Sequence, residues 1–283
     1  MTPTRIVVRA FAKINLTLEV LGARPDGYHE LRTILQSIAL HDTLTFRAAP
    51  GDFRIACDDP ASPTDRTNLV WAAAEAVWRA SGHRGRPKNV LVEIKKRIPL
   101  QAGLGGGSSD AAAAIRGLTK LWGLELTSDR QRTIAARLGS DVPFFLEGGT
   151  ALGVERGDRL FPLIDTKAAW VTLVIPAFGV STKDAYQWLD SESRQVSRGA
   201  GPVNDLQGPV SRHHPEILRM VRALQREGAE QAAMSGSGSA VFGLFESRIV
   251  AGRAAGRLAG STRRTLVTRT LNRARFARLS TCR

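Results

Sequence analysis

The sequence predicts an α+β protein with two lobes. Its 283 residues lie at the length where one hydrophobic core stops growing and chains divide into separate units. Stretches with a hydrophobic period of two, typical of strands, and stretches with a period near 3.6, typical of helices, follow one another in mixed order. Because this pattern changes near Gly157, we expect one lobe over residues 1–156 and a second lobe over residues 157–283.

The first expected elements are extended. From Ile14 to Val20 apolar residues alternate with polar ones, which predicts a strand with Lys13 and Asn15 together on its non-core face. Residues 25–27, Pro-Asp-Gly, are a turn signal that ends this strand. A second extended stretch follows over residues 34–46.

Helices and a further strand complete the first lobe. We expect a helix over residues 68–80, a strand over 90–96, a glycine-rich stretch, and an alanine-rich helix that ends near Trp122. Another helix is predicted to begin with the capping box Ser128-x-x-Gln131 and to end at Gly139.

The second lobe is expected to alternate strands and helices around a long connection. Its predicted elements are a strand at 170–175, a helix at 182–189, a loop at 202–205, a helix at 215–228, a strand at 241–245, a helix at 248–258 and a strand at 265–271.

The composition is ordinary for a globular protein, with 43% hydrophobic and 23% charged residues. Two isolated cysteines, Cys57 and Cys282, neither build a disulfide framework nor show metal-ligand spacing. Residues 1–10 lack the apolar core of a signal peptide, and the longest apolar stretch, 168–178, is too short to span a bilayer. We therefore expect a cytoplasmic protein with no membrane partner.

The net charge of +14 raises the question of a nucleic-acid partner. Residues 248–283 contain ten arginines and no acidic residue, so the rest of the chain carries only 14 − 10 = +4. This segment keeps apolar periodicity, so we interpret it as a solvated face of a folded lobe and expect no nucleic acid, with an RNA-binding role as a distant alternative.

A glycine loop, Gly103-Leu-Gly-Gly-Gly-Ser-Ser109, lies between a predicted strand and a predicted helix. Glycines let the backbone approach a ligand closely, and the helix adds its free N–H groups and the positive end of its dipole. The loop lacks the Gly-Lys-Ser/Thr ending of a Walker A loop and the third glycine of a dinucleotide fold. It nevertheless predicts a site for phosphate groups.

Two motifs make the chain resemble the GHMP kinases. Pro99–Ala113 resembles the family's second motif, which wraps the phosphates of ATP, and Ser235–Ala240 is similar to its third motif, a glycine loop on the nucleotide side. The resemblance extends over nearly the whole chain. It implies an ATP-binding N-terminal lobe similar to ribosomal protein S5 domain 2 and a ferredoxin-like, substrate-binding C-terminal lobe, with residues 13–31 contributing to the substrate site.

The resemblance also implies a set of ATP-binding residues, of which the first two line the adenine pocket and the others belong to the second motif. They are Asn68, Lys96, Pro99, Ala102, Gly103, Leu104, Gly105, Gly106, Gly107, Ser108 and Ser109.

Lys13 and Asp141 are the candidate catalytic pair. Taken alone, Asp141 could cap a short helix and Lys13 could be an exposed strand lysine. Residues 12–15, Ala-Lys-Ile-Asn, and residues 141–143, Asp-Val-Pro, match two stretches that lie side by side in the GHMP kinases. The resemblance implies that Asp141 accepts the hydroxyl proton, and that Lys13 keeps Asp141 ionised and stabilises the developing alkoxide.

The substrate side is suggested by Tyr28-His29 and Tyr186, which include both tyrosines of the chain. Ordinary packing of the tyrosines is the alternative. These positions resemble the branch of the family that acts on a cytidine diphosphate sugar alcohol, where aromatic rings stack on the cytosine and the histidine binds its edge. The full set of substrate-binding residues that the resemblance implies is Asn15, Tyr28, His29, Asp141, Thr182, Tyr186, Gly236 and Gly238.

The expected activity is transfer of the γ-phosphate of ATP, with Mg²⁺, to the 2-hydroxyl of that sugar alcohol in the non-mevalonate route to isoprenoids. A GHMP kinase for another small alcohol, of the mevalonate or homoserine type, is the alternative. We expect a monomer or a weak homodimer. The pair His213-His214 has no third ligand nearby in the sequence, so we expect no metal site made by the protein alone.

Overall fold

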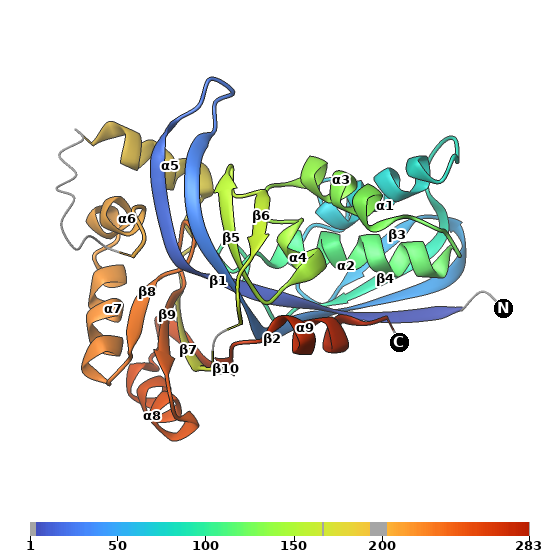
Figure 1. The fold of residues 1–283 in the computed structure, drawn as a ribbon. Coiled ribbons are helices and arrows are strands. Elements are labelled where there is room, and N and C mark those ends of the chain that lie inside the picture. The colour runs from blue at the N-terminus through green and yellow to red at the C-terminus, as the bar shows by residue number, and fades with distance from the viewer. Residues whose placement is uncertain (1–3, 166, 193–202, 283) are drawn as a thin grey trace.

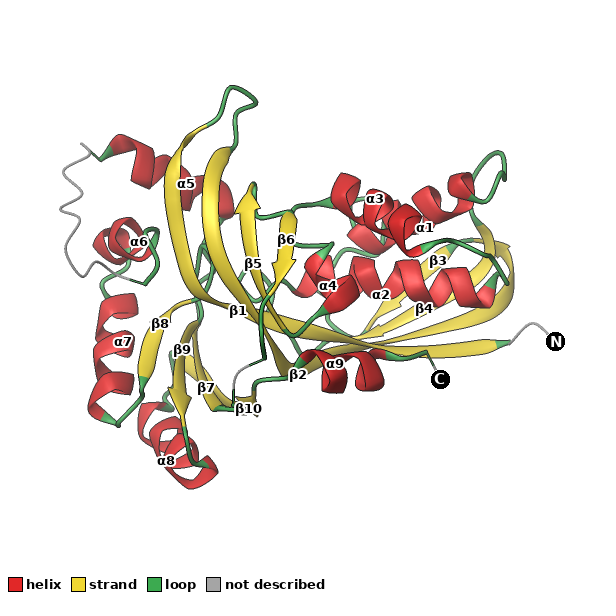
Figure 2. Ribbon diagram, in the orientation of Figure 1, coloured by secondary structure: helices red, strands yellow, loops and turns green. Residues whose placement is uncertain are grey.

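The computed structural model describes residues 4–165, 167–192 and 203–282. Within these residues the chain forms two sheets with helices packed on each, which confirms the α+β class and the two lobes (Figure 1). Figure 2 shows that long strands run from the helical layer of the first lobe to the edge of the second. No helix of the described residues is long and apolar enough to cross a membrane.

The first sheet is built around two long antiparallel strands, β1 (Arg5–Ala23) and β2 (His29–Asp52), which pair from Arg5↔Arg47 to Ala23↔His29. On β2 the sheet extends in the order β3-β4-β2-β5-β6. The remaining strands are β3 (Arg54–Cys57), β4 (Lys88–Lys95), β5 (Thr150–Glu155) and β6 (Arg159–Pro162).

One face of this sheet is covered by α1 (Leu69–Ala80), α2 (Gly106–Leu121), α3 (Ser128–Leu138) and α4 (Phe144–Glu147). Helix α2 lies directly on β1 and β2 because its inner face consists of small residues: a Cβ on Gly117 would come within 2.3 Å of the ring of Phe46. This packing fixes the axis of α2 and therefore the position of its N-terminus.

The second sheet has the order β10-β7-β9-β8, and all its pairs are antiparallel. Its strands are β7 (Trp170–Pro176), β8 (Gln231–Met234), β9 (Val241–Phe245) and β10 (Arg263–Arg269), and its helices are α5 (Thr182–Ser191), α6 (Gln207–His213), α7 (Glu216–Arg226) and α8 (Arg248–Leu258). Helices α7 and α8 pack on this sheet, and the strand-helix-strand-strand-helix-strand order is the ferredoxin-like topology that was expected.

The other face of the second sheet packs against the first lobe. Ile14 and Ile38 of the first sheet and Leu104 of the glycine loop share a buried cluster with Leu173 and Phe242 of the second sheet. Because the glycine loop takes part in this cluster, the junction between the lobes also determines where the loop lies.

Several details differ from the expectations. The N-cap of α3 is Thr127, whose side chain accepts a hydrogen bond from the amide of Arg130, so the predicted cap at Ser128 is wrong by one residue. Strand β6 follows the expected boundary at residue 156 but pairs with β5, and the final helix α9 (Arg273–Ser280) packs on β1. The first sheet therefore continues past that boundary, and the chain returns to the first lobe at its end.

The sequence analysis did not identify the shortest elements, β3, α4, β6, α6 and β8, because a few residues cannot show a period. It also missed β5 and α9. The arginine-rich segment is folded, as expected, into α8, β10 and α9 over its described residues. In the predicted loop 202–205, Pro202 lies outside the described residues.

Candidate active site

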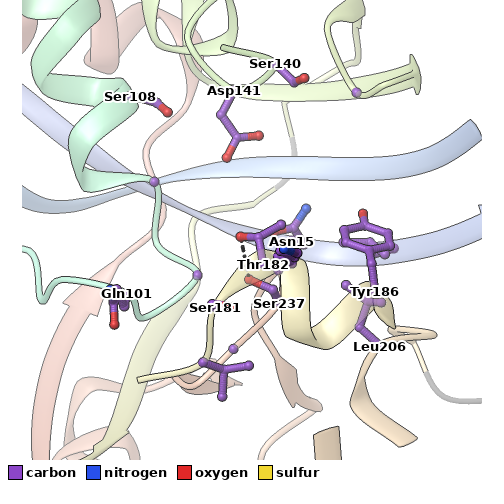
Figure 3. Close-up of a pocket in the computed structure, with 18 of the residues that line it drawn as sticks. Asn15, Gln101, Ser108, Ser140, Asp141, Ser181, Thr182, Tyr186, Leu206 and Ser237 are labelled. Carbon is purple, nitrogen blue, oxygen red and sulfur yellow. Dashed lines mark hydrogen bonds between the residues drawn. The ribbon is translucent and has the colours of Figure 1, made fainter. Parts of the chain in front are cut away.

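A cavity of about 990 Å³ opens between the two lobes. Its walls come from the glycine loop and β1 of the first lobe and from α5 and the loop after β8 of the second. Figure 3 shows Ser108 and Asp141 on one side of this cavity and Thr182, Ser237 and Tyr186 on the other. Residues from both lobes therefore face one space.

The glycine loop can pass through its surroundings only without side chains. Gly103 has a φ of 71°, and a Cβ there would lie 2.0 Å from the carbonyl oxygen of Ser235. Gly105, with a φ of 72°, is the left-handed N-cap of α2, and a Cβ on it would meet the ring of Phe145 and the side chain of Lys13. The N-terminal amides of α2 are thus brought to the cavity wall, where they can bind an anion.

The second glycine loop, residues 235–240, supports the first. The Ser235 hydroxyl donates a hydrogen bond to the Gly103 carbonyl over 2.9 Å and accepts one from the amide of Asn15 over 3.3 Å. The amide of Ala240 also donates to the carbonyl of Ala102. Both loops and β1 are therefore joined through backbone groups, with Gly236 and Gly238 on the cavity wall.

Lys13 and Asp141 meet at the cavity. Lys13 Nζ lies 3.5 Å from Asp141 Oδ2 and donates a 2.6 Å hydrogen bond to Asn15 Oδ1. Lys13 is only 4% exposed, so the alternative of a solvent-exposed strand lysine is wrong: the second lobe covers that face of β1. Helix α4, which follows Asp141, is not capped by a side chain, so the capping alternative for Asp141 also fails.

The substrate-side residues gather at the other end of the cavity. The His29 ring stacks on Tyr186 with 4.6 Å between centroids, and its Nε2 lies 2.8 Å from Asp190 Oδ1. Burial raises the pKa of Tyr186 well above its usual value, so its phenol stays neutral. Tyr28 is half exposed on the cavity wall, which leaves one face of its ring accessible to a planar ligand.

Thr182, the first residue of α5, lies on the cavity wall next to the second glycine loop. Its hydroxyl lies 3.2 Å from that of Ser237, so a hydrogen bond joins the start of α5 to the second glycine loop (Figure 3).

The structure adds cavity residues that the sequence analysis missed. The guanidinium of Arg156, from the turn between β5 and β6, lies over the Tyr28 ring at 5.1 Å from its centroid. Gln101, Ser181 and Asp190 also line the cavity. The expected lobe boundary placed Arg156 at the end of a lobe and not at a site. Gln101 lies within the second motif and Ser181 precedes Thr182, but neither was matched to a site position, and Asp190 belongs to no motif.

Three predicted ATP-binding residues lie outside the lining of the cavity. The Asn68 side chain caps α1 by accepting from the Val70 amide, and the buried Ser109 hydroxyl donates to the Phe11 carbonyl. The Lys96 ammonium is bound by Asp42 and Asp110. Leu69, the neighbour of Asn68, does line the cavity together with the loop residues from Pro99 to Ser108.

His213 and His214 each stack on an aromatic ring, and His213 is exposed. His213 stacks on Trp188 and His214 on Phe178, with ring centroids 4.1 Å and 4.3 Å apart. Among the described residues, no group of three or more His, Cys, Asp or Glu side chains is placed to hold a metal ion.

Comparison with known proteins gives one consistent picture. Residues 68–149 match the family model for the GHMP kinases N terminal domain, and residues 192–261 match that for the GHMP kinases C terminal. The chain is 42% identical over 286 residues to a 4-diphosphocytidyl-2-C-methyl-D-erythritol kinase of Moorella thermoacetica, covering 94% of this chain and 99% of that relative. A kinase of the same name from Gloeobacter violaceus is 42% identical over 275 residues, covering 89% and 90%.

Solved structures agree with these relatives. A crystal structure of 4-(cytidine 5'-diphospho)-2C-methyl-D-erythritol kinase superposes with a TM-score of 0.77 at 34% identity, covering 93% of this chain and 98% of the other. A mevalonate kinase of Methanococcus jannaschii superposes with a TM-score of 0.71 at 14% identity, covering 94% and 98%, and shares the fold alone.

Proposed function

The chain belongs to the 4-diphosphocytidyl-2-C-methyl-D-erythritol kinase family of the GHMP kinases, and we propose that the cavity between its lobes is the active site. The enzyme is a kinase of the non-mevalonate route to isoprenoid precursors, with ATP as co-substrate. It transfers the γ-phosphate of ATP to the 2-hydroxyl of 4-diphosphocytidyl-2-C-methyl-D-erythritol.

The observation that carries the site proposal is the meeting of Lys13 and Asp141 beside the N-terminus of α2. Lys13 Nζ is 3.5 Å from Asp141 Oδ2, and its side chain is within van der Waals reach of Gly105. Phosphoryl transfer to an alcohol depends on positioning, on neutralisation of charge and on an acceptor for the hydroxyl proton. The pair offers the last two next to a phosphate-binding loop.

In this proposal each part of the site has its own role. The amides of the glycine loop and of α2 bind the triphosphate, and Asp141 accepts the proton of the 2-hydroxyl as its oxygen attacks the γ-phosphorus. Lys13 stabilises the negative charge that develops on the attacking oxygen. Tyr28, His29 and Tyr186 hold the cytosine by stacking and by contact with its edge.

Magnesium fits this site as an ion brought by ATP. Among the described residues, Asp141 and Asp190 are the carboxylates that line the cavity, and Asp190 is engaged with His29. Mg²⁺ in kinases is bound by one or two carboxylates together with phosphate oxygens and waters. Because Asp141 is assigned to the hydroxyl proton and Asp190 to His29, phosphate oxygens and waters would hold the ion, which would neutralise charge on the phosphates.

A substrate panel tests the proposal. The wild-type enzyme is incubated with γ-labelled ATP and with the cytidyl sugar alcohol, mevalonate or homoserine in separate reactions. We expect label to be transferred to the cytidyl substrate, because only this alcohol carries a base that the Tyr28–His29–Tyr186 end can stack. Transfer to mevalonate or homoserine instead would overturn the substrate assignment but leave the kinase assignment intact.

A further inference from the structure

We infer that Thr33 is a positioning residue for phosphoryl transfer, which acts on Lys13 through the side-chain amide of Asn15. This inference rests on the proposed function, because it assigns Lys13 to catalysis. Thr33 lies on β2 opposite Leu18 of β1, three residues beyond Asn15, and its hydroxyl accepts a hydrogen bond from the side-chain amide of Asn15.

The first step is the environment of the Lys13 ammonium. Its shortest contact is the 2.6 Å hydrogen bond to Asn15 Oδ1, whereas Asp141 Oδ2 lies at 3.5 Å. An ammonium group has three donors on a flexible stem, so a short bond to a fixed acceptor determines its position. The orientation of the Asn15 amide therefore controls where the charge of Lys13 lies.

The second step is what holds that orientation. An asparagine side chain can rotate by half a turn and exchange its oxygen for its NH₂ group, and a flipped Asn15 would present donors to the ammonium. Asn15 Nδ2 donates to Thr33 Oγ1 over 2.8 Å, and the Thr33 hydroxyl donates to the Thr17 carbonyl over 2.6 Å. A carbonyl can only accept, so the single hydrogen of Thr33 is committed to Thr17.

It follows that Thr33 Oγ1 offers only lone pairs to Asn15. If the Asn15 amide flipped, its oxygen would face Thr33 Oγ1, which has no hydrogen to donate to it. Its NH₂ group would at the same time face the Lys13 ammonium, which is also a donor. Asn15 and Thr33 line the cavity but are each only 3% exposed, so little of either side chain is open to water that could relieve either conflict. The hydroxyl of Thr33 therefore selects one orientation of Asn15.

The third step is a local irregularity of the sheet that makes this arrangement possible. The β1–β2 register shifts between Asn15 and Thr17, and the amide of Ile34 donates to the Thr17 side chain. The Thr17 carbonyl is thereby available to the Thr33 hydroxyl, as β-bulges beside active sites often re-aim groups. The methyl group of Thr33 faces Gly153 on β5, where an added Cβ would lie 3.1 Å away, so the glycine leaves room for this rotamer.

Thr33→Val tests the inference because it keeps the branched shape and removes only the hydroxyl. We expect kcat to fall by about tenfold to a hundredfold, since displacement of a catalytic group by about an ångström has effects of this size. The KM for ATP should change by less than about threefold, because Thr33 acts on Asn15 and Lys13 and not on the glycine loop. Thr33→Ser, which keeps the hydroxyl, should restore kcat.

A double-mutant cycle identifies the route of the effect. In an Asn15→Ala background Thr33→Val should cause no further loss of kcat, because the amide that it orients is gone. Additive losses, a normal kcat in Thr33→Val, or a rise in the alcohol KM alone would each overturn the inference. If Thr33→Val does not fold, comparison of Thr33→Ser with Thr33→Ala isolates the hydroxyl in the same way.

Thr172→Val is the matched control. Thr172 is a buried strand threonine of the second sheet whose hydroxyl donates to the Ala251 carbonyl of α8 over 2.9 Å, so its replacement removes an equivalent bond that does not involve Lys13, Asn15 or Thr33. It should lower thermal stability about as Thr33→Val does, with kcat unchanged. All variants are assayed with the alcohol that the wild type phosphorylates fastest. A wild type that is inactive on every alcohol would contradict the proposed function. An active wild type whose kcat is matched by Thr33→Val would contradict only the role of Thr33.

Discussion

Two lysines of this enzyme are equally buried but have opposite surroundings. Lys13 is 4% exposed and Lys96 is 7% exposed. Lys96 Nζ is bound by two buried carboxylates, Asp42 at 2.5 Å and Asp110 at 2.8 Å. Lys13 has a neutral amide as its nearest partner and one partly exposed carboxylate, Asp141, at 3.5 Å.

The two lysines also lie on different sides of the start of α2. A Cβ on Gly106 would lie 3.5 Å from Lys96 Nζ, behind the glycine loop, whereas a Cβ on Gly105 would lie 3.2 Å from Lys13 Cγ, at the cavity. Asp42 also accepts hydrogen bonds from the amides of Arg97 and Ile98, which lead into the loop.

The difference teaches how the same residue type serves two purposes. Burial alone would lower the pKa of Lys96, but Asp110 and Asp42 more than offset this and raise its pKa, so its charge is fixed and fully compensated. Lys13 is less completely compensated, and its charge remains available to a ligand. The first arrangement holds a loop in place and the second can act on a substrate.

The largest expected effect is on the Lys13 side. Asp141→Asn should lower kcat by about 10²–10⁴-fold, the usual contribution of a positioned acid or base. Binding of ATP should persist, because the glycine loop and its amides are unchanged. Steady-state kinetics and calorimetric titration with ATP measure the two quantities. A near-normal kcat would mean that Asp141 is not the proton acceptor.

The next effect is on the Lys96 side and concerns stability. Lys96→Met leaves Asp42 and Asp110 buried without a cation, so the free energy of unfolding should fall by about 3–5 kcal/mol, as when one partner of a buried pair is removed. Urea unfolding measures it. Lys13→Met is the matched control: it should cost kcat and at most about 1 kcal/mol of stability, because Asp141 stays partly solvated. Equal losses of stability in both variants would contradict the comparison.

The Lys96 cluster should also make stability depend on pH. Burial raises the pKa of Asp110 to about 7, with Lys96 opposing this shift and Asp42 adding to it. The usual value is 3.8, so between about pH 4 and pH 7 the folded state binds the proton more than the unfolded chain does. The stability that Asp110 contributes is therefore complete below pH 4 and is lost as the pH rises through 7.

Asp110→Asn isolates this contribution. The difference in unfolding free energy, wild type minus variant, should decline as the pH rises from 4.5 to 7.5 (roughly the span of the two pKa values). Urea titrations at four values of pH suffice to measure it. A difference that stays constant over this range would mean that Asp110 is ionised throughout.

The smallest effect is expected at the far end of the cavity. Tyr28→Ala should raise the KM for the cytidyl substrate by about tenfold, since one base–aromatic stack contributes about 1–3 kcal/mol. The KM for ATP should stay within about twofold, because the Tyr28 ring contacts Arg156 and is not part of the glycine loop. An equal rise in both KM values would show that Tyr28 supports the fold rather than the base.

Much of the site could be predicted from the sequence because its signals are local. The glycine loop is a continuous run whose residues dictate its backbone, and the alternation after Lys13 places Asn15 on the same side of one strand. Helix boundaries with strong caps, such as Asn68 and Gly139, were also identified within a residue.

The sequence by itself thus determined the loop, the candidate lysine and carboxylate, and the α+β class. Lys13 was predicted as catalytic and Lys96 as ATP-binding, but the sequence around each lysine did not show which side chains would bind it. Only the tertiary structure decided that Lys96 meets Asp42, 54 positions away, and that the backbone N–H of Asn15 meets the Ser235 hydroxyl, 220 positions away. The chemistry of a buried charge depends on the partners that folding brings to it, and no local pattern encodes partners so distant in the chain.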